Sequence, residues 1–341
     1  MKKLLLVILV VLVGSPLLFG QLTEIEADFS ALMQGLADEI QPYIQQDALN
    51  ADGIGAASLG DSHFYLSLSA GGVLTNGIFT FRSDPNYFDL LDVGGLLELL
   101  VAPILPGDLY DLVETMFLLP TARIGLGFRF PLDIELLLTF SMVPQELTDA
   151  LLDMLITDSA ARQLLNLSFT HMNIGGRIRK TLVRDTEAFP ALSVGAGYTY
   201  GNFSFSYPLQ FIQSLGEGDA SADLVLDGDI GINTTVHTAG IDVAISKKLA
   251  IFVPFLNVGA WYQWNDFTAG GNFSAEIVGP DDVPLVEETL APSGARSTED
   301  LAILINAGFE IALGPFHLVP EATFNTATGT LSAQAAMRFQ F

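Results

Sequence analysis

The chain ends on the stretch Leu331-Ser332-Ala333-Gln334-Ala335-Ala336-Met337-Arg338-Phe339-Gln340-Phe341. All odd-numbered positions of this stretch are apolar, whereas the even-numbered positions hold Ser332, Gln334, Arg338 and Gln340. Because successive side chains of a strand point to opposite faces, one face of the segment is apolar and the other is polar. A solvent-facing strand of a soluble protein rarely combines such an apolar face with an aromatic residue at the chain end. The stretch therefore predicts a strand that lies against lipid.

The same alternation recurs along the chain and predicts ten strands. They cover residues 64–70, 122–130, 132–140, 171–179, 192–200, 238–246, 252–263, 301–311, 316–325 and 331–341. Most of them have the length of about 9–11 residues that a tilted strand needs to cross a membrane. Gly72 to Phe81 and Phe267 to Ile277 are also strand-like. These two segments are either loop extensions or further strands, which would raise the number to as many as about 14.

The polar faces of the strands carry charged side chains of both signs. In a soluble sandwich these faces would meet water and the apolar faces would form the core. In a closed barrel the polar faces line the lumen, where opposite charges can pair. The lumen-lining residues predicted on this basis are Arg123, Arg129, Asp133, Glu135, Arg177, Arg179, Asp242, Glu310, Glu321 and Arg338. The sequence leaves open which of them pair.

The lengths of the connections favour the barrel. Counted back from the C-terminus, they alternate between short and long, with one exception in the brief connection 325–330. Outer-membrane barrels have short periplasmic turns and longer outer loops. The predicted fold class is therefore all-β: a transmembrane, antiparallel, up-and-down β-barrel with an N-terminal helix and helical outer loops.

Composition agrees with a membrane protein and excludes several partners. Half of the residues are hydrophobic, but no segment after residue 20 is long and apolar enough for a helical span. The net charge of -25 argues against nucleic acid as a partner. The acidic residues gather in three inter-strand segments, which we interpret as solvated loops or as loops that collect divalent cations. The absence of Cys excludes disulfides and a lipid-modified cysteine.

The amino end predicts export. Lys2 and Lys3 precede an apolar run from Leu4 to Val13, and a cleavage site before Gln21 follows. This pattern is typical of a secretory signal peptide, and the apolar run is too short for a membrane anchor. The predicted organisation is a signal peptide at 1–20, an N-terminal helix and glycine-rich lead-in at 21–60, and a barrel at 61–341, located in the cell outer membrane.

Two further segments are predicted to be helical. Residues 22–48 have apolar residues at helical spacing, from Ile25 and Phe29 to Ile40 and Ile44, and this helix either plugs the lumen or lies in the periplasm. Two long outer loops are unusually apolar, and the second is predicted to be helical over 145–165. Large apolar patches usually bind something, so we expect ligand capture there, unless the loops pack on each other and cap the barrel. The expected capture residues are Leu97, Leu100, Ile104, Phe117, Leu151 and Leu155.

The terminal Phe341 and the alternation before it resemble the C-terminal signature of bacterial outer-membrane β-barrels. That resemblance implies recognition of Phe341 by the barrel-assembly machinery and contact with outer-membrane lipid. With its N-terminal segment and apolar outer loops, the chain also loosely resembles FadL-like transporters of hydrophobic compounds, in which outer loops form an apolar groove and an N-terminal segment plugs the lumen. It equally resembles uncharacterised outer-membrane proteins, which would imply no activity.

Familiar catalytic and metal-binding patterns are missing from the sequence. Its four histidines are His63, His171, His237 and His317, and none has a partner at metal-ligand spacing. Outer-membrane lipid hydrolases carry a serine two residues after the catalytic histidine, and no histidine here is followed in that way. We therefore expect no enzyme, no cofactor and no metal. The predicted function is a channel or transporter that passively admits small, hydrophobic solutes; the alternative is a non-transporting, adhesin-like surface barrel.

Overall fold

The computed structural model describes residues 2–50, 55–60, 62–74, 118–143, 168–215, 222–278 and 284–341. The elements are α1 (Lys2–Asn50), β1 (Phe64–Leu74), β2 (Leu118–Phe130), the 3-10 turn η2 (Pro131–Asp133), β3 (Ile134–Val143), β4 (Ser168–Val183), β5 (Ala191–Leu215), β6 (Ala222–Ser246), β7 (Phe252–Val278), β8 (Pro284–Leu290), β9 (Ser293–Leu313), β10 (Phe316–Asn325) and β11 (Leu331–Gln340).

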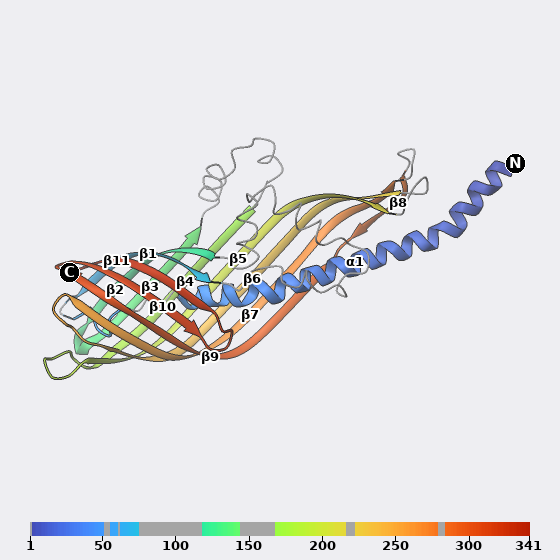
Figure 1. Cartoon of the computed structure of the whole chain (residues 1–341). Coiled ribbons are helices and arrows are strands. Elements are labelled where there is room, and N and C mark those ends of the chain that lie inside the picture. Colours follow the sequence, from blue (N-terminus) through green and yellow to red (C-terminus); the bar gives the residue numbers. More distant parts are fainter. Residues whose placement is uncertain are drawn as a thin grey trace.

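Ten of these strands form a closed antiparallel barrel. Each pairs with its neighbour in chain order, β6 pairs with β7, and β1 pairs with β11 to close the ring. Among the described residues, the remaining strand, β8, pairs only with the far end of β7. The barrel predicted from the alternating pattern is therefore confirmed, with the ten strands in the predicted positions (Figure 1).

The apolar faces of the strands point outward. Leu68, Ile178 and Ile241 are 53%, 59% and 66% exposed, whereas charged residues next to them in sequence, such as Arg177 and Asp242, are buried inside the ring. This arrangement is the reverse of a soluble protein and is that of a barrel whose outer wall meets hydrocarbon. The prediction that the apolar faces form the outer wall and the polar faces line the lumen is thus confirmed.

Aromatic rings mark both edges of the apolar belt. At the end with the short turns, Phe64 lies against Phe128, and Phe316 lies against Phe339, with ring centroids 5.4 Å apart in both pairs. At the other end, His237 stacks on Trp264 at 5.3 Å. From Phe252 to Trp264 on β7 the strand advances about 40 Å, or about 28 Å along the barrel axis at a tilt of about 45°. That height fits the apolar band of a bilayer of about 25 Å.

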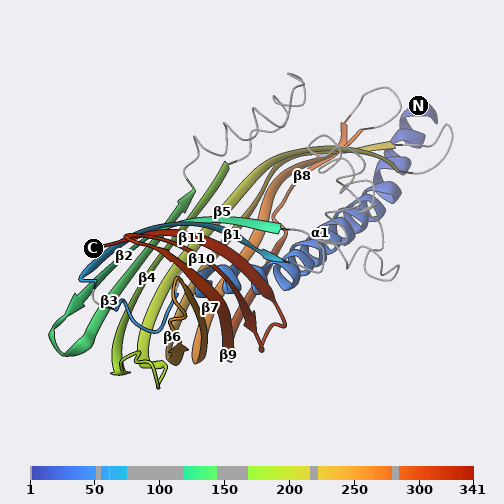
Figure 2. The ribbon, with the colours of Figure 1, turned by 60° about the vertical axis from the view of Figure 1, so that its left-hand side comes forward.

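Four strands continue far beyond the belt. β5, β6, β7 and β9 reach 21 to 27 residues, and together with β8 they form an open, curved sheet (Figure 2). The segment Phe267 to Ile277, which could have been an additional strand, is the outer part of β7. The other strand-like segment is Gly72 to Phe81. Its residues 72–74 extend β1, and the rest lies outside the described residues.

The polarity of the inward and outward faces of β7 is exchanged at the aromatic edge formed by His237 and Trp264, which we call the upper edge. Inside the belt the inward residues of β7 include Asn257 and Gln263, but above it they are apolar, as at Phe267, Phe273 and Ile277. On β7 the outward residues above the belt include the polar Thr268, Asn272 and Ser274. The extension therefore has the pattern of a sheet that stands in water and covers its apolar inner face with another element.

That element is α1, which is longer than the predicted helix at 22–48. It runs along the concave side of the extension and enters the ring, where it contacts β1, β5, β6, β7, β9 and β11 (Figures 1 and 2). Within the described part of the chain, no helix combines the length and apolarity that crossing a bilayer requires.

Candidate functional site: a lumen closed by the N-terminal segment

The C-terminal end of α1 is fixed to one side of the lumen by a single carboxylate. Asp47 is fully buried, and its Oδ2 lies 2.7 Å from His171 Nε2 and accepts a hydrogen bond of 2.6 Å from Asn173 Nδ2, both on β4. Arg123 on β2 pairs with the other carboxylate oxygen and donates to the Asp47 backbone carbonyl at 3.0 Å. One helix residue thus joins two strands of the wall.

Other residues of α1 bind β9 and β11. Gln46 Nε2 donates to Ser332 Oγ on β11 at 2.9 Å. Gln41 and Gln45 both donate to Thr298 Oγ1 on β9, at 3.0 and 2.9 Å. β9 lies across the ring from β4, and β11 lies two strands from β2 on the far side of β1, so the last turns of the helix contact several sides of the lumen.

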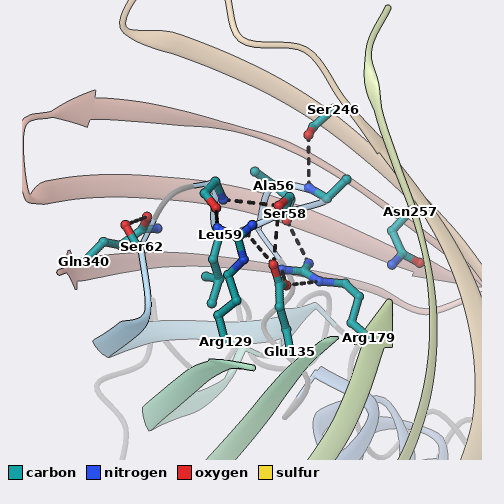
Figure 3. A network of polar contacts seen from close by, with 12 residues as sticks. Ala56, Ser58, Leu59, Ser62, Arg129, Glu135, Arg179, Ser246, Asn257 and Gln340 are labelled. Carbon is teal, nitrogen blue, oxygen red and sulfur yellow. Dashed lines mark hydrogen bonds and ion pairs between the residues drawn. The ribbon is translucent and has the colours of Figure 1, made fainter. Parts of the chain in front are cut away.

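Residues 55–60 fill the lumen below the helix (Figure 3). Glu135 on β3 receives hydrogen bonds from the Leu59 backbone at 2.8 Å and from Arg179 Nε at 2.7 Å. Arg179 in turn donates to the Ala56 carbonyl at 2.8 Å, and the Ala57 backbone donates to Ser246 Oγ at 3.1 Å. The wall charges therefore bind the backbone of the N-terminal segment as well as each other.

The structure brings most of the predicted lumen residues together in pairs. Arg177 lies 3.0 Å from Asp242, and its guanidinium covers the Trp261 ring at 5.2 Å. Arg338 Nη1 lies 3.4 Å from Glu310 Oε2, and the Arg338 guanidinium covers the buried Tyr65 ring. Glu321 accepts a hydrogen bond from Gln334, which also accepts one from Arg123 at 2.7 Å.

Two predicted residues lie at the rim rather than within the lumen. Arg129 and Asp133 pair at 2.5 Å beside the η2 turn, and Asp133 also binds Arg184, which is largely exposed. The hydrogen bonds from Arg184 and then Arg129 lower the pKa of Asp133 to about 2. Asp133 is thus charged throughout the physiological pH range.

The upper part of the passage is apolar. Ile25, Phe29, Leu32 and Met33 of α1 are buried against the inner face of the extension, and the Phe29 ring lies 5.0 Å from that of Phe273. Partners on the strands include Phe203, Leu226, Ile232, Phe267, Ala275, Ile277 and Leu290. The extension is therefore an apolar vestibule above a charged lumen, and α1 occupies both.

This arrangement leaves no water-filled path among the described residues. Arg177, Asp242 and Arg338 are at most 4% exposed, whereas the walls of an open channel would contact water. A polar cavity beside Ser67, Arg123 and Glu321 measures about 10 Å³, which at most matches the lower limit for a single water molecule. Within the part of the chain that the structure describes, the N-terminal segment therefore occludes the lumen.

Sequence reasoning missed the residues that connect the helix to the wall, chiefly Asp47, His171 and Asn173. A usable signal existed: Asp47 follows Ile40 and Ile44 at helical spacing and so places a charge on the apolar stripe of the helix. A charge in that position needs a buried partner. The six predicted capture residues all fall in 75–117 and 144–167, outside the described residues. Among the described side chains, no group of three or more His, Asp or Glu could hold a metal ion.

No protein-family model matches the sequence, and no curated protein matches it. Three solved structures of bacterial outer-membrane barrels are similar in fold. The translocator domain of the autotransporter NalP from Neisseria meningitidis is 10% identical, with 90% of this chain and 96% of that chain covered and a TM-score of 0.31. The outer-membrane protease OmpT from Escherichia coli is 11% identical, with coverage of 82% and 94% and a TM-score of 0.35. Omp33 from Acinetobacter baumannii is 6% identical, with coverage of 83% and 100% and a TM-score of 0.27.

These likenesses are too weak to transfer an activity, and they include barrels of several kinds rather than FadL-like transporters in particular. The barrel architecture and its lipid-facing belt are what place the chain in a bacterial outer membrane. One prediction is wrong. We expected from the missing motifs that the chain is not an enzyme, but OmpT shows that a barrel similar to this one serves as a protease, so this architecture does not exclude catalysis.

Proposed function

We propose that the chain is an outer-membrane transport protein that passively admits small, hydrophobic solutes, and that α1 and residues 55–60 form its gate. The observation that carries the proposal is the closed lumen. Its charged walls are covered by the protein's own N-terminal segment through hydrogen bonds to Glu135, Arg179 and Arg123, and not by tighter packing of the walls themselves.

The wall supports a passage once this segment moves. Arg177 and Asp242 pair within the wall, as do Arg338 and Glu310, so these charges keep partners when the helix leaves. The apolar inner face of the extension would then become accessible and could receive a hydrophobic solute. The apolar side chains predicted in 75–117 and 144–167 would enlarge this capture surface.

A disulfide between α1 and the wall tests the gate. The Ala48 Cβ lies 3.4 Å from the position that a Cβ at Gly201 would occupy, which is close to the usual Cβ separation of a disulfide. Since the chain has no cysteine, the variant A48C/G201C would carry only this pair. The single variant G201C is the matched control, because it introduces the same crowding of Asn173 without the crosslink.

We expect planar-bilayer conductance and liposome uptake of a hydrophobic dye in the reduced double variant and in G201C, and loss of both on oxidation. Equal transport by the oxidised and reduced forms would show that solutes do not follow the space that α1 occupies. No transport by G201C, the reduced variant or the unmodified protein would refute the proposal.

The alternative function, a non-transporting surface barrel, is favoured by one specific observation. Ile25, Leu32 and Ile44 of the apolar stripe of α1 are buried, and Phe29 and Met33 have no exposed surface, as expected of a permanent structural element. The same crosslinking experiment separates the two functions. We also retain as a proposal that the assembly machinery recognises Phe341, a residue that is 68% exposed.

A further inference from the structure

We infer that the outer part of α1, which includes Thr23, lies outside the cell, and that this barrel carries its own N-terminal segment outward through its lumen to display it on the surface. The inference concerns the direction of the helix and holds whether or not the barrel transports solutes. It rests on three features of the described residues: which end of the barrel faces outward, the order of the helix contacts, and the path of the chain into β1.

The outer end is identified by the connections. The turn η2, the connection 247–251 and the two-residue connection at Gly314 all lie at one end of the barrel, together with the C-terminus. Short turns and the chain end mark the periplasmic side of outer-membrane barrels. The extension of β5, β6, β7 and β9 is at the opposite end and therefore points away from the cell.

The contacts of α1 descend from this outer end into the barrel. In order along the helix, they join Glu26 to Ala291, Ser30 to Ser293, Asp38 to Arg296, Gln41 to Thr298 and Asp47 to Arg123. Thr298 pairs with Asn265, beside the upper aromatic edge. Thr23 is 18 residues before Gln41 and so lies about 27 Å farther along the helix axis.

The chain continues in the same direction after the helix. Residues 55–60 line the lower lumen, and His63 donates a backbone hydrogen bond of 2.7 Å to the Phe341 carbonyl at the periplasmic end, where β1 begins. A segment that begins outside, runs through the ring and reaches β1 at the inner end must have been passed outward, because the protein is delivered to the outer membrane from the periplasm.

Single cysteines in the otherwise cysteine-free chain test this topology in intact cells. The test variant is T23C, at an exposed position in the outer part of α1. A327C, in the exposed connection after β10 at the outer end, is the control for outside, and K248C, in the exposed turn before β7, is the control for the periplasm. The probe is a membrane-impermeant maleimide, applied before and after permeabilisation of the outer membrane.

We expect T23C to react in intact cells to the same extent as A327C, and K248C to react only after permeabilisation. Reaction of T23C only after permeabilisation would overturn the inference, and so would no reaction under either condition. The heat-modifiable mobility of each variant in SDS gels shows that the barrel has folded. E24C, at the neighbouring exposed position, serves as the second test variant if T23C fails to fold.

Discussion

Truncation of Phe29 to alanine should release the outer half of α1 from the vestibule. The Phe29 side chain is completely buried, and its ring packs on Phe273 at 5.0 Å. A buried aromatic side chain covers about 150 Å² or more, which corresponds to about 4 kcal/mol at ~25 cal/mol per Å². Measured losses for truncation of buried phenylalanine are about 3–5 kcal/mol. The free energy of local opening of α1 should therefore fall by about that amount.

Hydrogen exchange of the α1 backbone amides, measured by mass spectrometry on the protein in nanodiscs, reports this opening. A loss of about 3–5 kcal/mol raises the opening constant about 10²- to 10⁴-fold. The matched control is E24A, an exposed position on the same helix, where we expect an effect within about 0.5 kcal/mol. Exchange in β2 to β4 should stay unchanged in both variants. If F29A accelerates exchange in α1 no more than E24A does, the vestibule does not hold the helix as argued.

Three further predictions concern the rim, the lower lumen and the membrane position. The pKa of Asp133 in the folded protein, about 2, lies below the ordinary value of 3.8 for an aspartate. Its ion pairs therefore stabilise the fold fully above pH about 4–5 and lose this effect as pH falls through about 2. Accordingly, the thermal midpoints of the unmodified protein and D133N should differ at neutral pH and converge near pH 2; a constant difference would contradict this. E135A leaves Arg179 buried without its carboxylate partner and should lower the free energy of unfolding, measured in urea, by about 3–5 kcal/mol. The double variant E135A/R179M should recover part of this loss. A loss under about 1 kcal/mol in E135A would contradict the lower-lumen network. Brominated lipids should quench the fluorescence of W261F, whose remaining Trp264 lies at the outer aromatic edge of the belt. They should not quench that of W264F, whose remaining Trp261 is buried. Equal quenching of the two variants would contradict the position of the membrane along the barrel.

The sequence by itself determined the wall of the barrel. In Leu331 to Phe341, and in nine other segments, side chains alternate with period two, and this period fixes which residues share a face whatever the rest of the chain does. The connection lengths then indicated closure and orientation. The helix at 22–48 was also predictable, because apolar residues such as Ile25 and Phe29 recur at a spacing that only a helix brings onto one face.

Only the tertiary structure decided what fills the barrel. Asp47 meets Arg123 across 76 positions of sequence, and Glu135 meets Leu59 across the same separation. Pairings of this kind depend on the stagger of the closed ring and on the depth to which the helix enters it, and no local pattern encodes either. The inversion at Phe267 was visible in the sequence: the odd-numbered positions of β7 include polar residues before Phe267 and are apolar at Phe273 and Ile277 after it. Its meaning required the structure, because an apolar face above the membrane has a role only when α1 is seen to cover it.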